Sequence, residues 1–154
     1  MMNRLLVRVF VLGCALCLAS CEVEMNGAEN IEWLQAPGTE DSNLPFSSAV
    51  RVGKLLFLSG QIGIAPGMNT LAEGGIQGET QQTMENIKAT LEQFGSSLDR
   101  VVKCTVFLAD MSEWGAMNEV YRTYFTHPPA RSALGASGLA LDARVEIECI
   151  GVVN

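Results

Sequence analysis

Histidine is nearly absent from this chain, and basic residues are few. The single histidine, His127, lies in a His-Pro-Pro stretch, so a zinc site or a Ser-His-Asp triad lacks the residues it needs. We therefore predict that His127 is a surface loop residue and that the chain has no metal site. Ten Lys and Arg residues stand against 17 Asp and Glu residues, a formal charge of −7 that disfavours phosphate backbones. Nucleic acid is not an expected partner.

Repeats and low-complexity stretches are also absent, and aromatic residues make up only 6% of the sequence. This composition argues against a solenoid or a disordered chain. The 154 residues, 48% of them hydrophobic, are enough for one domain with a real core.

The first twenty residues have the composition of an export signal. Arg4 and Arg8 precede an apolar run, residues 9–18, that is too short to span a bilayer. The run ends in Leu18-Ala19-Ser20-Cys21, which resembles the bacterial lipobox. The resemblance implies a lipoprotein signal peptide (1–20) and lipidation of Cys21. The segment 21–45 then consists of the lipidated cysteine and a tether, because residues 22–45 are polar, acidic and interrupted by proline and glycine residues. An ordinary cleaved signal and an uncleaved anchor are the alternatives.

These features predict an exported protein that is lipid-anchored in the bacterial cell envelope. Glu22 follows the cysteine in place of the aspartate that resembles an inner-membrane retention signal, which favours the periplasmic side of the outer membrane. Without residues 1–20 the chain keeps 8 basic and 17 acidic groups, a formal charge of −9. Cys104 and Cys149 lie in strand-like segments, where we expect small buried side chains and no disulfide bridge.

The folded domain is predicted to span residues 46–154. A Gly53-Lys54 break between apolar segments predicts a hairpin with positive φ at the glycine. Met84, Ile87, Leu91 and Phe94 recur at helical spacing, with Thr80 as candidate cap and Gly95 as stop. Further patterns predict a strand at 100–109, a helix at 112–125 and strands at 130–136 and 143–153. The order ββαβαββ predicts an α+β sandwich of two layers, with both helices on one face of a mixed sheet.

Alternation along the last strand places Val145, Ile147 and Cys149 on one face and Arg144, Glu146 and Glu148 on the other. The neighbouring strand reads as apolar on both faces, with Val102, Val106 and Leu108 on one side and Val101 and Phe107 on the other. No helix remains to cover the second face. We therefore predict a closed homo-oligomer.

Six motifs in this order resemble the RidA/YjgF family of imine and enamine deaminases. They begin at Leu55, Gln81, Val101, Asn118, Pro129 and Val145, and they include Ser59-Gly60-Gln61-Ile62, Pro129-Ala130-Arg131-Ser132 and Val145-Glu146-Ile147-Glu148. The resemblance covers residues 45–153. It implies a chorismate-mutase-like fold and a homotrimer whose sheets line a central β-barrel. It also implies hydrolysis of 2-imino or 2-enamino acids to 2-oxo acids and ammonia in clefts between subunits, without a cofactor.

The resemblance also implies roles for individual residues. Arg131 matches the arginine that binds the substrate carboxylate, because a guanidinium fork satisfies both oxygens at once. Glu146 matches the glutamate that orients the attacking water. The other matched substrate-binding positions are Asn118, Phe46, Ser59, Gly60 and Ala133.

Alternatives remain open for these residues and for the function. Arg131 and Glu146 could instead form a buried ion pair that fixes the oligomer, and Asn118 could be a helix-surface residue. Phe46 stands where many active members carry a tyrosine, so a hydroxyl is missing. A non-catalytic trimer that binds a small carboxylate metabolite is therefore the alternative function. Ribonuclease or chaperone-like activity, attached to relatives, is disfavoured by the acidic balance.

Overall fold

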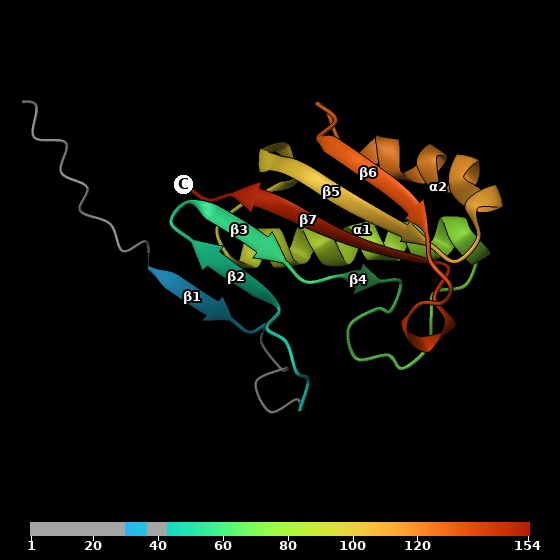
Figure 1. The fold of residues 1–154 in the computed structure, drawn as a ribbon, viewed down its shortest axis with the longest axis horizontal. Helices are drawn as coiled ribbons and strands as arrows, with labels where there is room; N and C mark the ends of the chain where they lie inside the picture. The colour runs from blue at the N-terminus through green and yellow to red at the C-terminus, as the bar shows by residue number, and fades with distance from the viewer. Residues whose placement is uncertain (1–29, 37–42) are drawn as a thin grey trace, which may run out of the picture.

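The computed structural model describes residues 30–36 and 43–154, which form a sheet backed by helices (Figure 1). The signal peptide and Cys21, together with most of the predicted tether, lie outside the described residues. The elements are β1 (Ile31–Leu34), β2 (Ala49–Val52), β3 (Leu55–Leu58), β4 (Gln61–Ile62), α1 (Gly75–Gln93), β5 (Val101–Leu108), α2 (Trp114–Tyr121), β6 (Ala130–Gly135) and β7 (Val145–Val152). Within these ranges, neither helix combines the length and hydropathy needed to cross a bilayer.

The strands form a mixed sheet in the order β1-β2-β3-β7-β5-β6, as predicted for an α+β sandwich. Only β5 and β6 run parallel among the described pairs, because α2 carries the chain back between them. β7 is central: β5 pairs along one side, and β3 and then β4 pair along the other. The predicted hairpin joins β2 to β3 through Gly53, whose φ is 56°.

Both helices lie on one face of the sheet, and Figure 1 shows α1 passing behind β7 and β3. Met84, Ile87 and Leu91 of α1 are fully buried against the sheet, as the helical spacing predicted. The helix ends before Gly95, whose φ of 82° supplies the expected stop. Its start differs from the prediction, because the helix begins at Gly75 and Thr80 is not its cap. The Thr80 hydroxyl instead donates to the Ile76 carbonyl inside the helix, at 2.6 Å.

The alternation predicted for the last strand is confirmed from Val145 onward, whereas Arg144, predicted on the polar side, precedes β7 and pairs with Glu79 of α1 and with Glu113. Val145, Ile147 and Cys149 are at most 2% exposed on the helix side, while Glu146 and Glu148 face the other way. We call this second side the open face, since no described helix covers it.

The first residues of β5 do not follow the predicted alternation. Val101 is buried and Val102 is 47% exposed, the reverse of the predicted assignment of Val101 to the uncovered side. A register shift against β7 between Val101 and Lys103 causes the exchange, since one extra residue in a strand turns the preceding side chains over. The predicted apolar character of the open face nevertheless holds, because large apolar side chains stay exposed there: Ile31, Trp33, Leu55, Phe57, Val102 and Leu134.

The sheet begins earlier than the sequence indicated. We expected the fold to begin near Phe46, yet β1 pairs with β2 in antiparallel register, with Trp33 opposite Val50. This strand has only four residues, and polar residues and prolines surround it, so no alternation of apolar and polar residues can be recognised in the sequence. Only its pairing with β2 identifies it.

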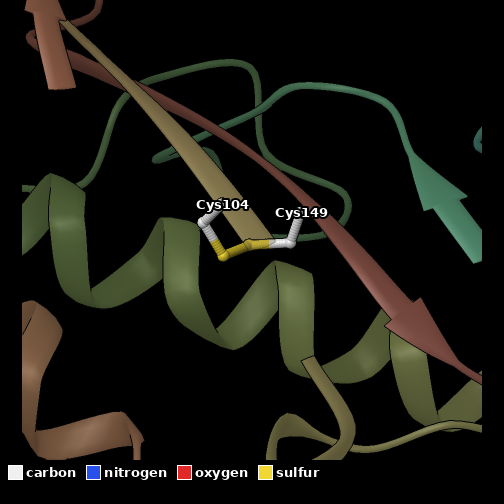
Figure 2. The surroundings of a disulfide bond; sticks show 2 residues. All are labelled: Cys104 and Cys149. Atoms are coloured by element: carbon white, nitrogen blue, oxygen red, sulfur yellow. A yellow bond between two sulfur atoms is a disulfide. The ribbon is translucent and has the colours of Figure 1, made fainter. Parts of the chain in front are cut away.

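Cys104 and Cys149 form a disulfide bond, which corrects the prediction of no bridge. The two residues lie directly opposite each other on β5 and β7, with Cα atoms 4.1 Å apart. The bond lies on the helix side of the sheet, above α1 (Figure 2), and both residues are at most 2% exposed. The prediction that each cysteine is buried in a strand is correct. The bond between them depends on which strands are neighbours, which the sequence pattern does not show.

Reduction of this bond should destabilise the protein by about 2–4 kcal/mol, because the bridge closes a loop of 45 residues in the unfolded chain. Denaturant unfolding with and without a reductant measures the loss. The double variant Cys104→Ala, Cys149→Ala is the control and should unfold at one midpoint under both conditions. An unchanged midpoint for the parent, once reduction is verified by the release of two thiols, contradicts the expectation.

Candidate functional site

Arg131 has no acidic partner in the part of the chain that the structure describes. It lies on the edge strand β6, and its guanidinium carbon sits 4.7 Å from the ring centre of Tyr121 and 5.9 Å from that of Trp114. Aromatic faces attract a cation without using its N–H donors. The guanidinium is therefore held by two rings of α2 while its donor fork stays available for an anion.

Arg131 lines a pocket of about 270 Å³ against the C-terminal end of α2. Asn118 lines the same pocket and is only 8% exposed, so it is not a helix-surface residue. Residues three or four positions apart lie on the same side of a helix. That side of α2, and of the helical turn that follows it, faces Arg131. We call this site the arginine pocket; its lining residues are Asn118, Tyr121, Arg122, Phe125, Pro128, Pro129 and Arg131.

Tyr121 forms the floor beneath the guanidinium. It is 5% exposed, and its hydroxyl has no hydrogen-bond partner among the described residues. Burial raises the pKa of Tyr121 to about 12, although the positive charge of Arg131 lowers it in part. The ring therefore stays neutral at physiological pH and holds Arg131 by cation–π attraction alone.

Glu146 lies on β7, beside the point where β3 gives way to β4. It pairs with Ile62 on one side and Phe107 on the other. Its carboxylate occupies the space that a Cβ atom on Gly60 would fill, so the missing side chain of Gly60 makes room for it. The glycine that follows β3 thus lets the Glu146 carboxylate approach the backbone closely.

Gly60 also borders a second hollow of about 260 Å³, which we call the Gly60 cleft. Phe46 and Ser59 line it too, so the structure brings three of the predicted substrate-binding residues together. The Ser59 hydroxyl donates to the carbonyl of Ser47 at 2.6 Å, and its N–H donates to the carbonyl of Ser48 at 3.1 Å. These bonds tie the end of β3 to the segment that carries Phe46.

The start of β7 is fixed by a buried acid of α1. Glu79 is 4% exposed, and its carboxylate accepts the backbone N–H of Arg144 at 2.8 Å. Arg144 precedes Glu146 by two residues, so this bond helps to set where the Glu146 carboxylate lies.

Arg131 and Glu146 point to opposite faces of the sheet. Arg131 shares its register with Cys104 on the helix side, whereas Glu146 shares its register with Phe107 on the open face. No ion pair joins them within the described chain, whose salt bridges involve Arg51 and Arg144. One copy of the chain therefore does not bring the two predicted catalytic residues to a common cavity.

The chain resembles known proteins over most of its described length. The family profile described as Endoribonuclease L-PSP matches residues 36–153. A 2-iminobutanoate/2-iminopropanoate deaminase of Mus musculus is 42% identical over 109 residues, which cover 70% of this chain and 81% of the mouse protein. A RutC family protein of Pyrococcus horikoshii is 47% identical over 107 residues, covering 69% and 85% of the two chains.

A solved structure agrees with these relatives. The crystal structure of RidA from the Antarctic bacterium Psychrobacter sp. PAMC 21119 matches with a TM-score of 0.72 and 36% identity, covering 79% of this chain and 99% of that one. The chain belongs to the RidA/YjgF family.

For this RidA-family chain, the predicted site residues divide into two groups. Arg131 and Asn118 share the arginine pocket, whereas Phe46, Ser59 and Gly60 share the Gly60 cleft next to Glu146. Ala133 lies two residues beyond Arg131 on the helix side and packs against the core instead of lining either hollow. His127 is exposed, as predicted. Over the described ranges, no group of three His, Cys, Asp or Glu residues is arranged to hold a metal ion.

Sequence reasoning missed the other residues of the arginine pocket. The helix predicted at 112–125 contains Tyr121 and Arg122, but neither was given a role in a site, and neither was Trp114, which contacts Arg131. A signal was present, because Tyr121 and Arg122 follow Asn118 by three and four residues and so share its side of the helix.

Tyrosine titration tests the burial of Tyr121 beneath Arg131. The chain has two tyrosines, so Tyr124→Phe leaves Tyr121 alone, and its tyrosinate absorbance should rise near pH 12 instead of pH 10. Because the unfolded chain ionises near pH 10, this tyrosine stabilises the fold fully below that pH and loses its contribution as the pH rises through 12. A midpoint near pH 10 in the folded protein would contradict the assignment.

Proposed function

We propose that this protein hydrolyses 2-imino and 2-enamino acids to 2-oxo acids and ammonia. One observation carries the proposal: a guanidinium without an acidic partner, held by aromatic rings in a pocket with a buried asparagine. Such a fork suits a carboxylate, the group that every 2-imino acid carries. Relatives named 2-iminobutanoate/2-iminopropanoate deaminase in mouse and rat support the same reaction.

The proposed active site is built from two copies of the chain. One copy contributes Arg131 and Asn118, and its neighbour contributes Glu146 with the Gly60 cleft. Two observations support this division. Arg131 and Glu146 face opposite sides of one sheet. The open face also leaves Phe57 at 38% and Val102 at 47% exposure, which is apolar area suited to burial against another copy. A closed homotrimer, which the family resemblance implied, would repeat this site three times.

In the proposed reaction, Arg131 holds the substrate carboxylate and so fixes the position of carbon C2. Glu146 of the neighbouring copy accepts a proton from a water molecule as that water adds to C2 of the C=N bond. The proton then passes to the amine nitrogen of the tetrahedral intermediate. As the intermediate collapses, its hydroxyl proton also passes to the nitrogen, the C–N bond breaks, and the C2 carbonyl and ammonia are formed. An enamine first takes up a proton on carbon to become the imine.

Phe46 favours a second candidate function, a trimer that binds a small carboxylate without turning it over. The ring lines the Gly60 cleft, but it offers no hydroxyl to a water or substrate. In this alternative, Arg131 still captures the carboxylate and Glu146 moves no proton. Endoribonuclease activity, which the family description mentions, is less well supported, since the charge of −7 opposes RNA binding.

Mixed oligomers test the proposed reaction and its two-copy site together. Arg131→Ala and Glu146→Ala should each lower kcat/KM for freshly generated 2-iminobutanoate by at least about 100-fold, since each removes a group used in the transition state. Co-expressed under two different tags, the variants should regain up to about one quarter of the parent activity. Random assembly gives one interface in four an intact Arg131 facing an intact Glu146.

The matched control is co-expression of Arg131→Ala with itself under both tags, which should stay inactive. No recovery in verified mixed oligomers would refute the two-copy site. Full activity of the Arg131→Ala protein alone would refute the proposed role of Arg131 in the reaction. A parent that binds 2-oxobutanoate without releasing ammonia would favour the binding protein.

We also propose that the protein is exported and anchored through a lipid on Cys21. The disulfide between Cys104 and Cys149 supports export, because disulfides persist in oxidising compartments. Since β1 begins at Ile31, nine residues separate it from Cys21, a reach of about 30 Å when extended. The sequence predicted a longer tether, residues 22–45. Because β1 lies within this range, only residues 22–30 separate Cys21 from the sheet.

Membrane fractionation tests the anchor. The parent should sediment with membranes, whereas Cys21→Ala should appear in the soluble fraction or retain its leader. The double variant Cys104→Ala, Cys149→Ala is a control that removes the two disulfide-bonded cysteines and should leave the anchoring unchanged. Equal membrane retention of Cys21→Ala, after cleavage of its leader, would count against lipidation.

A further inference from the structure

The arginine pocket contains a second cation. Arg122 lines it together with Arg131, and none of its lining residues is acidic. From this we infer that the preferred substrate is a 2-imino dicarboxylate, whose second carboxylate binds Arg122. The inference rests on the proposed function and deepens it by naming the substrate class.

Arg122 is held in place by a hydrogen bond from its Nε atom. It follows directly after α2, and its Nε donates to the carbonyl of Asn118 at 3.1 Å. Arg122 takes part in none of the ion pairs of the described residues, which leaves its terminal nitrogens available. The bond to Asn118 orients the side chain, which lines the pocket.

The charge of this pocket is opposite in sign to the net charge of the whole protein. The chain carries a net charge of −7, yet two guanidiniums share this hollow without a carboxylate. Phe125, Pro128 and Pro129 form an apolar wall, where charges are screened less than in water. A ligand with two negative charges neutralises both cations, whereas a monocarboxylate leaves Arg122 unpaired.

The size of the pocket fits such a ligand. Its volume of about 270 Å³ is roughly nine times the ~30 Å³ that one water molecule occupies in the liquid. A five-carbon 2-imino dicarboxylate has about ten heavy atoms. Its two carboxylates lie at opposite ends of a short chain, as two separate arginines require.

The test compares substrates of equal length. The five-carbon dicarboxylate imine is generated from glutamate, and the five-carbon monocarboxylate imine from norvaline, each by an amino-acid oxidase. We expect the parent to favour the dicarboxylate in kcat/KM. Arg122→Gln should lower the dicarboxylate-to-monocarboxylate ratio at least tenfold, mainly through KM, and Arg122→Lys should restore part of it.

Lys88→Gln is the matched control, because it removes one exposed positive charge from α1 outside the pocket and should leave the ratio unchanged. A parent that prefers the monocarboxylate, or an Arg122→Gln protein with an unchanged ratio, overturns the inference. The latter result is expected if an acid of the neighbouring copy occupies Arg122.

A binding measurement separates this inference from the proposed function. Calorimetric titration with 2-oxoglutarate and with 2-oxopentanoate requires no turnover. Tighter binding of 2-oxoglutarate, weakened at least tenfold by Arg122→Gln, supports the dicarboxylate site even if no imine is hydrolysed. Equal or weaker binding of 2-oxoglutarate by the parent overturns it, even if imines are hydrolysed.

Discussion

The side chains of a β-strand alternate between the two faces of its sheet, and the described helices cover only one face of this one. That constraint decides where each functional group lies. Arg131 takes the helix side, where aromatic rings of α2 hold it, and Glu146 takes the open face, where Gly60 makes room for it. The same alternation that builds the core therefore separates the two residues that the proposed chemistry must unite.

The open face connects assembly to function in the proposed mechanism. Its exposed apolar side chains favour burial against another copy, and such burial is also what would bring a second Arg131 to Glu146. Stability of the oligomer and completion of the site then depend on the same surface. A substitution on this face, far from either catalytic residue, would alter both.

Contacts within one copy position Glu146 and Arg131 separately. The disulfide joins β5 to β7 at their centre, and the buried carboxylate of Glu79 fixes the start of β7. Around Arg131, the rings of Tyr121 and Trp114 hold the guanidinium without neutralising it. In the proposed mechanism, such placement lowers the cost of ordering these groups when a substrate binds.

The sequence alone determined most of the secondary structure, the two-layer α+β architecture and the polar side of β7, because local periodicity encodes them, and its short motifs indicated the family. It did not determine the Cys104–Cys149 bond, β1, the exchange of Val101 and Val102, or the opposite orientation of Arg131 and Glu146. Each of these depends on which strands lie side by side and in what register. Register joins residues far apart in the chain, so only the tertiary structure decided them.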